Sequence, residues 1–477
     1  MIHIFIFHRD LRLIDNTTLI YQTKTLDSHI LPIFIFPPEQ IDPKKNKYFS
    51  DASVQFMIES LHELSSVIKK KKSKLLFFKG DTLTVLKSIH KMVPVQSIGF
   101  NIDYTPYARQ RDGIIKKWCD DNNIVCFMKE DYSLHQITEK ESNKEDGTPY
   151  LVYTPFYRNC INNLTVRPVD KFKSFKFKRV PDLDKNKYLI EEKEIDNFYK
   201  ANDKINVHGG RDLGLKILNN LEKFKNKYEK CRDFFTYKTT FLSAYLKFNA
   251  VSIRETYYKM VKTLGKKCGL IRELYFRDFY MTVTYNFPHI LVGQITGKNV
   301  SYRREYDKIK WTYDKDLYQK WSTGTTGFPV VDSGMRQLNT INYQQNRLRM
   351  VCSSWLIKDA HLDWRLGETY YASKLVDYDP INNYHGWTWS GGMGTDAQPW
   401  FRLMNPWTQQ QDYDPKCEFI YQWIEELKDV PMEDIHNWWK PEVHEKWIKL
   451  GVKYPKPCLD HKTERLETLR LYREGLK

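Results

Sequence analysis

The first 130 residues alternate short apolar runs with longer amphipathic segments. The runs are rich in Ile, Leu, Val and Phe, which is typical of strands, and the segments between them have helical spacing. This alternation predicts a doubly wound, parallel sheet with helices on both faces. No GxGxxG or GxxxxGK[ST] pattern is present, so the main nucleotide is not assigned to this part of the chain. The predicted strands are 2–7, 30–36, 74–80, 97–103 and 123–130, and the predicted helices lie near 51–68, 82–92 and 105–120.

The alternation stops after residue 130, and residues 131–205 are irregular and highly charged, as expected for a long interdomain linker. Its segment "KFKSFKFKRV" alternates Lys with Phe, which fits either nucleic-acid contact or a half-buried edge with solvated lysines, and we favour the edge. From 206 to 477 the apolar positions recur with helical spacing. The chain is therefore predicted to be α/β plus all-α: a domain at 1–130, a linker at 131–205 and a helical domain at 206–477.

Residues 382–409, "NNYHGWTWSGGMGTDAQPWFRLMNPWTQ", fit neither pattern. They are rich in Asn and Gly and lack sustained alternation, which predicts neither a regular helix nor a strand. The stretch nevertheless carries Trp387, Trp389, Trp400 and Trp407, out of 13 tryptophans in the chain. Large aromatic side chains either brace an irregular loop against a core or face a flat ligand such as a base or a flavin. Any flat-ligand chemistry therefore belongs to the second domain.

Composition narrows the class of protein. A chain of 477 residues with 41% apolar residues can form two or more cores, and its net charge of +16 fits a polyanionic partner as well as it fits a Lys-rich, A+T-biased composition. The eight cysteines are scattered without a CxxC pair, which indicates reduced thiols. Cys458 and His461 form a lone CxxH, so no metal site is expected. No signal peptide or membrane-length apolar run is apparent, which predicts a soluble intracellular protein of unspecified compartment.

Two segments place hydroxyl and charged groups next to helical patterns. In "KTTFLSAYLKFNAVSIRE" (238–255), Thr239, Thr240 and Ser243 precede an apolar helical pattern, which suits a phosphate site or an ordinary helix cap. In "RELYFRDFY" (272–280), Glu273 and Arg277 lie four residues apart on one helical face. They form either an internal ion pair or contacts to a base.

Two further segments add charged groups of opposite sign. In "NRLRMVCSSWLIKDAHLDWRLGETYY" (346–371), Asn346 and Met350 share a helical face, while Arg347 and Arg349 point in different directions. One arginine can thus face a phosphate and the other an internal acid. In "VDYDPI" (376–381), two carboxylates flank an aromatic residue without His or Cys companions, which favours hydrogen bonds to an organic ligand over a metal.

Together these segments resemble the DNA photolyase/cryptochrome family over nearly the whole chain, and most closely the cyclobutane pyrimidine dimer photolyases. The most specific matches are "TTGFPVVDSGMRQL" (325–338), "NRLRM" (346–350), "DWRLGE" (363–368) and "WTWSGGMGTDAQPWFR" (387–402). The resemblance implies an α/β antenna domain followed by a helical domain that buries FAD, in a monomer. An antenna chromophore, whether folate, deazaflavin or a second flavin, is left undetermined.

The resemblance also assigns cofactor positions. Arg349 matches an arginine that pairs with the first ring-facing acid, Asp377, and Asn383 matches the side chain that faces the flavin N5 atom. Trp387, Trp364 and Trp311 match a triad that carries electrons from the surface to photoexcited flavin. The full FAD-binding set that the resemblance implies is Tyr228, Thr239, Thr240, Phe241, Leu242, Ser243, Arg349, Asp377, Tyr378, Asp379 and Asn383.

The implied substrate is UV-damaged DNA. In this family excited, reduced FAD gives an electron to a flipped-out pyrimidine dimer and receives it back after the ring splits. The positions implied to be catalytic are Trp387, Trp364, Trp311, Asn383, Glu273 and Met350. The positions implied to contact the lesion or the DNA are Arg232, Glu273, Phe276, Arg277, Asn346, Arg347, Met350, Trp389 and Gln409.

The chain departs from the family pattern at two positions. Phe276 stands where the motif ELxWREFY has a dimer-stacking Trp, which predicts repair with weaker lesion affinity, and Asn249 stands where Gly is common. Two alternative functions stay open. Six-four photoproduct photolyases carry a His-containing segment where this chain has "NRLRM", and cryptochrome photoreceptors often carry a long C-terminal tail, which is not apparent here.

Overall fold

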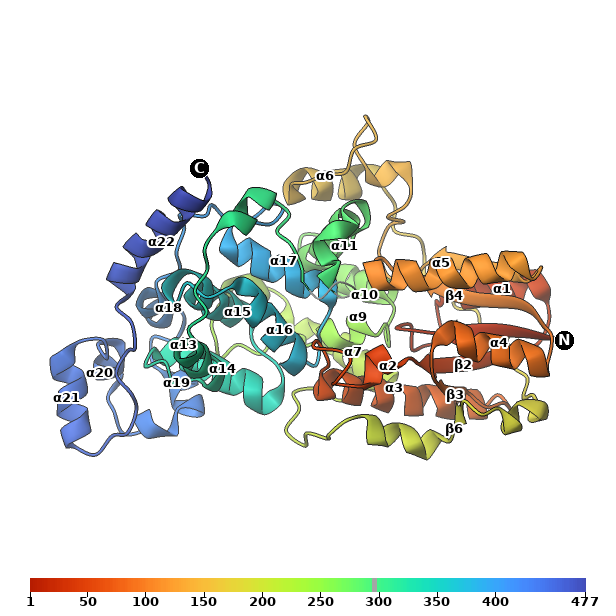
Figure 1. Cartoon of the computed structure of the whole chain (residues 1–477), viewed down its shortest axis with the longest axis horizontal. Helices are drawn as coiled ribbons and strands as arrows, with labels where there is room; N and C mark the ends of the chain where they lie inside the picture. The colour runs from red at the N-terminus through yellow and green to blue at the C-terminus, as the bar shows by residue number, and fades with distance from the viewer. Residues whose placement is uncertain (294–297) are drawn as a thin grey trace.

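The computed structural model describes residues 1–293 and 298–477. Its N-terminal part is built on a six-stranded sheet of order β5-β4-β1-β2-β3-β6, in which the first five strands pair in parallel. The predicted α/β and all-α parts are therefore both present, and they lie at opposite ends of the molecule (Figure 1). The parallel strands are β1 (Ile2–Phe7), β2 (Ile30–Phe36), β3 (Leu76–Lys79), β4 (Val95–Ile102) and β5 (Val125–Glu130).

Alternate side chains of each strand enter two different cores, because successive residues of a strand point to opposite faces. In β1, Phe5 and Phe7 join a core shared with α1 (Thr17–Leu26) and α3 (Asp51–Lys69). The alternate isoleucines of β1 join a second core with α4 (Thr82–Met92) and α5 (Pro106–Asp121). The first core continues without interruption into the helical domain, so the two halves of the molecule are packed together.

Residues 131–205 contain more structure than the predicted linker. They form a helix, α6 (Tyr153–Asn163), and a short strand, β6 (Leu189–Ile190), which pairs antiparallel with β3. The Lys–Phe alternation is a half-buried edge, as favoured: Phe175 and Phe177 are buried while the lysines beside them are exposed. Strand β6 has only two residues and pairs with a strand more than 100 residues away in the sequence, and α6 packs on a helix of the helical domain, so no local pattern marks either element.

The described residues after 206 form helices and the turns between them. A π-helical turn at Trp355–Asp359 follows α15. Among the described residues, no helix is both long and apolar enough to cross a membrane. The helices are α7 (Arg211–Asn219), α8 (Tyr228–Cys231), α9 (Ser243–Lys247), α10 (Ile253–Leu264), α11 (Gly269–Asn286), α13 (Lys315–Thr323), α14 (Pro329–Ile341), α15 (Asn346–Ser354), α16 (Trp364–Lys374), α17 (Pro380–Gly391), α18 (Pro406–Tyr413), α19 (Glu418–Trp423), α20 (Met432–His436), α21 (Pro441–Lys449) and α22 (His461–Gly475).

The prediction that residues 382–409 form no regular element is wrong. Helix α17 covers the first part of this stretch, and α18 covers its end. Pro380 occupies the first turn of α17, and the carboxylate of Asp379 caps it by accepting a hydrogen bond from the Asn382 amide at 3.0 Å. Burial of one face against α11, α15 and α16 outweighs the low helix propensity of Asn and Gly.

A buried ion network joins the two domains. Arg254 of α10 contacts Asp15 at 2.7 Å and Asp131 at 2.8 Å, and Arg12 contacts Asp131 at 2.8 Å. All four side chains are at most 1% exposed. Burial alone would raise the pKa of Asp131, but Arg12 and Arg254 hold it well below its usual range. Asp131 therefore stays ionised, and the network ties the sheet domain to the helical domain.

Candidate functional site

Two carboxylates lie where α17 begins. Arg349 donates to both oxygens of Asp377, at 3.0 and 3.1 Å, so the predicted pair is present. Asp379 instead pairs with Arg9 at 2.8 Å. Arg9 is not among the residues predicted from the sequence, although it follows β1 closely, at the carboxyl edge of the parallel sheet where ligand sites gather.

The surroundings of Asp379 are strongly positive. Burial would raise the pKa of its carboxyl, but Lys247, Arg9 and Arg277 lower it well below the usual range. Burial, with Arg9 nearby, lowers the pKa of Lys247 to about 8. Asp379 is therefore an anionic acceptor inside the protein, suited to the N–H groups of a buried ligand.

The hydroxyl-rich segment forms the turn that leads into α9. Phe241 has a φ of 54°, in the left-handed region, and α9 begins two residues later at Ser243. Thr240 is buried, and its hydroxyl accepts from the Leu242 amide at 3.4 Å. The first-turn amides of a helix have no acceptor within that helix, so hydroxyl and amide donors are concentrated here. Tyr228 of α8 is buried.

The three predicted triad tryptophans differ in exposure. Trp364 and Trp387 are buried, while Trp311 is half-buried. The Trp387 ring lies directly against Gly367, where an added Cβ would come within 2.0 Å of the indole. Asn383, one turn before Trp387, donates from Nδ2 to the backbone carbonyl of Glu368 at 3.0 Å. Asn383 and Trp387 of α17 therefore both contact α16, through Glu368 and Gly367.

The two arginines of α15 point to different partners, as its spacing predicts. Arg349 reaches the acid at α17, whereas Arg347 contacts Asp233 at 2.9 Å and Gln409 at 3.2 Å. Its guanidinium also lies 4.0 Å from the centre of the Tyr413 ring. Asn346 and Met350 share the exposed side of this helix, with Asn346 Nδ2 at 3.9 Å from the Met350 sulfur.

Helix α11 corrects two expectations about Arg277. Glu273 pairs with Arg232 at 2.9 Å rather than with Arg277. Arg277 is buried and donates to the backbone carbonyls of Tyr132 and Leu246. We therefore withdraw Arg277 from both the predicted ion pair and the predicted DNA contacts, because its guanidinium is committed to the interior.

Aromatic residues of the predicted site also make contacts that the sequence did not indicate. The Phe276 ring stacks on Tyr153 of α6, with centroids 3.4 Å apart and planes at 7°. Tyr378 stacks on Tyr48, and Trp389 is half-buried. Trp400 stacks on Tyr472, and Trp407 lies against Phe328. Both tryptophans therefore pack against other aromatic rings of the helical domain.

The sequence matches family models over most of its length. Residues 3–174 match the DNA photolyase model, and residues 270–474 match the model for the FAD binding domain of DNA photolyase. A deoxyribodipyrimidine photo-lyase of Buchnera aphidicola is 32% identical over 98% of this chain and 97% of its own length. The chain belongs to the DNA photolyase family.

Solved structures of the photolyase family share this fold. The archaeal photolyase of Sulfolobus tokodaii, described with two FAD molecules and a novel light-harvesting cofactor, matches with a TM-score of 0.85 and 36% identity over 99% of this chain and 100% of its own. A bacterial class III photolyase of Agrobacterium tumefaciens matches with a TM-score of 0.86 and 26% identity over 99% of this chain and 97% of its own. Both cover the sheet and helical domains together.

The cofactor of this photolyase family member is FAD, and the donors present fit it. Hydroxyls and first-turn amides at α9 suit the pyrophosphate, and the Arg349–Asp377 pair and anionic Asp379 suit the polar edge of a flavin ring. Phe241, whose φ of 54° lies in the left-handed region, is half-buried in the turn between Thr240 and Ser243.

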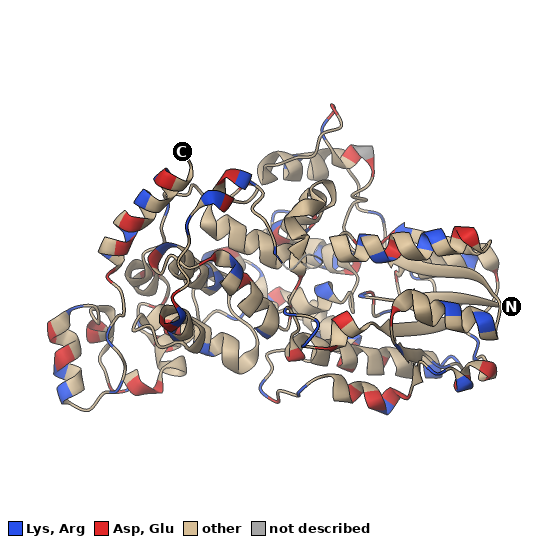
Figure 2. Ribbon diagram, in the orientation of Figure 1, with Lys and Arg blue, Asp and Glu red and all other residues tan. Residues whose placement is uncertain are grey.

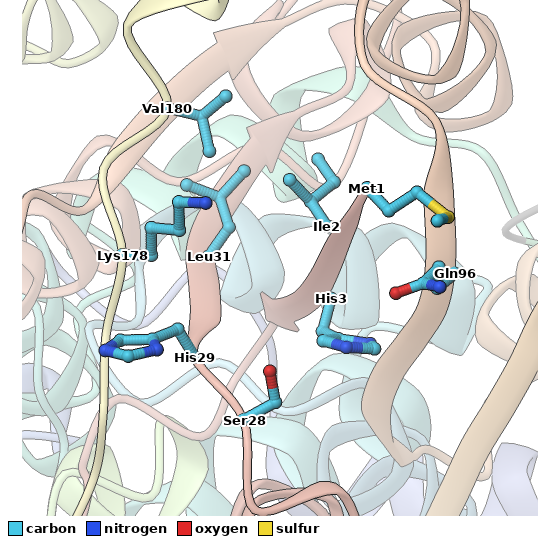
Figure 3. A pocket seen from close by; sticks show the side chains of 9 residues that line it. All are labelled: Met1, Ile2, His3, Ser28, His29, Leu31, Gln96, Lys178 and Val180. Carbon is cyan, nitrogen blue, oxygen red and sulfur yellow. The ribbon is translucent and has the colours of Figure 1, made fainter.

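The surface also has a small cavity at the amino end of the sheet and many basic side chains. A cavity of about 140 Å³ lies at the amino ends of β1 and β2, where His3, His29 and Lys178 line it (Figure 3). The predicted FAD residues all lie in the helical domain, and Arg9 follows the opposite, carboxyl end of β1, so this cavity is separate from them. Lys and Arg are spread over the helices of both domains (Figure 2).

Proposed function

We propose that this chain repairs cyclobutane pyrimidine dimers in UV-damaged DNA under light, by electron transfer from FAD to the flipped-out lesion. One observation carries the proposal. Helix α15 directs Arg349 inward to Asp377 and presents Asn346 and Met350 on its exposed side. The same nine-residue helix can therefore hold a cofactor on one side and a lesion on the other. Curated relatives named deoxyribodipyrimidine photo-lyase support this reading.

Bound FAD supplies the light-driven one-electron chemistry. The chain supplies orientation. Arg349, Asp377 and Asp379 fix the polar edge of the ring, the turn at residues 239–243 holds the phosphates, and Asn383 adds an uncharged hydrogen-bonding group. Most of these groups are held by contacts already made in the protein, so little ordering is needed on binding.

The outer face supplies DNA recognition. Arg232 and Arg347 are paired with Glu273 and Asp233, and both arginines can exchange these partners for backbone phosphates. A damaged pair is weakly stacked, which lowers the free energy needed to flip it out of the duplex. Phe276 and Trp389 offer aromatic surface to the flipped bases, and we assign Met350 of α15 and Gln409 of α18 as further contacts to the lesion or the DNA.

The tryptophans provide a route for electrons into the site. Trp311 is half-buried and reaches the surface, whereas Trp364 and Trp387 are buried toward α17. We assign them to photoreduction of the cofactor, separate from repair itself. This separation can be measured, because chemical reduction bypasses the tryptophans.

The first experiment follows recovery of thymine absorbance in UV-damaged oligothymidine under blue light, with photoreduced, anaerobic protein. We expect recovery in light and none in a dark control. The variant Trp387→Phe should lose photoreduction but keep repair after dithionite reduction. Recovery by neither route, with FAD bound and reduced, would refute the proposal.

The same assay separates the alternatives. A defined oligonucleotide with a six-four photoproduct replaces the dimer, and light-dependent recovery on that substrate alone would identify a six-four photolyase. Photoreduction without repair of either lesion would identify a photoreceptor of the cryptochrome type.

A further inference from the structure

A groove outside the proposed FAD and lesion sites combines three lysines with aromatic side chains. It has a volume of about 540 Å³ and is formed by the segment 223–238, which precedes the hydroxyl-rich turn. We call it the lysine groove. Lys223, Lys227 and Lys238 line it together with Phe234 and Tyr237. Its size matches that of a small-molecule or nucleotide site.

The positive charge of the lysine groove is not neutralised from within the protein. In the described parts of the chain, 1–293 and 298–477, none of its three lysines has an ion-pair partner. The acids of the same segment are occupied elsewhere: Glu222 pairs with Lys225 at 3.2 Å, Glu229 accepts from the Gly269 amide at 2.6 Å, and Asp233 pairs with Arg347 at 2.9 Å. Three exposed ammonium groups therefore line the groove without an ion-pair partner among the described residues.

The aromatic part of the lysine groove is unusually open. Phe234 exposes 39% of its surface, although a phenylalanine beside a folded core is ordinarily buried. Tyr237 is half-buried next to it. Cations beside an open aromatic face suit a ligand with both a phosphate and a flat ring, which is the chemistry of a nucleotide.

The lysine groove is distinct from the FAD residues but continuous with the DNA-facing side. Its lining does not include Thr239 or Thr240, and Tyr228 of the same segment is buried. On the other side, Phe234 contacts the Tyr413 ring edge-on at 6.3 Å, and Arg347 lies over that ring at 4.0 Å. A DNA strand that engages Arg347 is therefore led toward the groove.

We propose that the lysine groove binds one nucleotide of the DNA strand outside the lesion, with its phosphate against the lysines and its base against Phe234 and Tyr237. This inference rests on the proposed function for its partner, DNA, but not on repair itself. A free mononucleotide has the same chemistry, and the experiment separates the two sources.

The test compares two triple variants of the full-length FAD-bound protein by fluorescence anisotropy with lesion-free oligothymidine. One carries Lys223→Ala, Lys227→Ala and Lys238→Ala. The matched control carries Lys87→Ala, Lys91→Ala and Lys117→Ala, three exposed lysines of α4 and α5 that also lack ion-pair partners among the described residues. Circular dichroism verifies that both variants fold.

We expect the groove variant to bind about tenfold more weakly near 0.1 M salt, with a log–log salt slope reduced by about 1, because one phosphate contact is lost. The control variant should leave that slope unchanged. Phe234→Ala should weaken binding about fivefold or more with an unchanged slope, because stacking contributes without charge. Equal affinities and slopes for the two triple variants would overturn the proposal.

Two further measurements settle the source of the nucleotide. A dimer presented as an isolated dinucleotide has no flanking nucleotide, so the groove variant and the wild type should bind it equally. Thymidine monophosphate that binds the wild type but not the groove variant, while both bind DNA alike, would overturn the assignment to DNA. Absence of light-driven repair in the wild type would refute the proposed function and leave these binding results intact.

Discussion

Arginine–carboxylate pairs hold two regions of the molecule, and these regions differ in how far water reaches them. At the domain interface, Arg12, Arg254, Asp15 and Asp131 are at most 1% exposed. On the proposed DNA face, the side chains of Arg232 and Glu273 are 43% and 46% exposed. The groups are chemically alike, but their roles differ.

The two regions differ in what can compensate the charge of each side chain when its partner is lost. A buried pair must be complete, because removing one partner leaves a charge without water or counter-ion. An exposed pair contributes little to stability and can exchange its partner for another anion. The interface network therefore fixes the two domains, whereas Arg232, on the proposed DNA face, has a weakly held partner that a phosphate could displace.

The largest expected effect tests the buried side of this comparison. Asp131→Asn removes the anion that both Arg12 and Arg254 contact, and it should lower the free energy of unfolding by about 3–5 kcal/mol. Urea denaturation followed by circular dichroism measures this change. Asp120→Asn is the control, because Asp120 pairs with Lys116 at the surface of α5. Equal midpoints for the two variants would contradict the role of the network.

Glu368 sharpens the comparison, because it is a buried carboxyl without a paired arginine at hydrogen-bond distance among the described residues. Burial raises its pKa to about 7 from 4.5, although Asn299 donates to it at 2.7 Å. The native state therefore retains a proton that the unfolded state releases. Its stabilisation is complete below pH 4.5 and is lost as the pH rises through 7.

Glu368→Gln keeps the hydrogen-bond acceptor and cannot ionise. The variant should match the wild type at pH 4 and exceed its stability by about 1–3 kcal/mol at pH 8, as followed by thermal unfolding at both pH values. The same pH dependence in wild type and variant would mean that Glu368 does not titrate in this window.

Arg232→Gln tests the exposed side. The unfolding free energy should change by less than about 1 kcal/mol, because the pair with Glu273 is solvated. DNA binding should weaken by about fivefold, equally for damaged and undamaged oligonucleotides, with the salt slope reduced by about 1. Anisotropy titrations at several salt concentrations measure both. A large loss of stability with unchanged DNA binding would show that Arg232 stabilises the fold, as Arg254 does, and does not bind DNA.

How much of the structure could be predicted depends on whether the signal is local in the sequence. Strands such as 2–7 and 30–36 were found because their apolar pattern is local and continuous. The Arg349–Asp377 pair came from a family motif. The Arg9–Asp379 pair spans 370 residues, and no local pattern connects its partners. Arg277 was misjudged because its partners are backbone carbonyls of other segments, which have no residue signature.

Tertiary packing also overrode local propensity. Helix α17 is rich in Asn, Gly and aromatic residues, yet it forms because Asp379 and Pro380 start it and α11, α15 and α16 bury it. Gly367 has the complementary role, since its missing side chain makes room for the Trp387 ring. Such fits depend on which helices pack together, and no local sequence pattern reveals that.

Phe276→Trp has the smallest expected effect and tests whether a side chain on the proposed DNA face sets the affinity for the lesion. Phe276 stacks at 3.4 Å on Tyr153, which is buried and anchored through its hydroxyl to the Arg272 carbonyl. A larger indole on this fixed base would offer more surface to a flipped dimer, so lesion affinity should tighten by about two- to fivefold. Stability and binding of undamaged DNA should not change.

Competition titrations with dimer-containing and lesion-free oligonucleotides measure the ratio of affinities for Phe276→Trp and wild type. Tyr153→Leu removes the base of the stack and should lower the same ratio, and Phe276→Trp should partly restore it in the double variant. A ratio that stays constant in all three variants would show that neither ring meets the lesion. Selectivity would then have to come from α15 and Trp389.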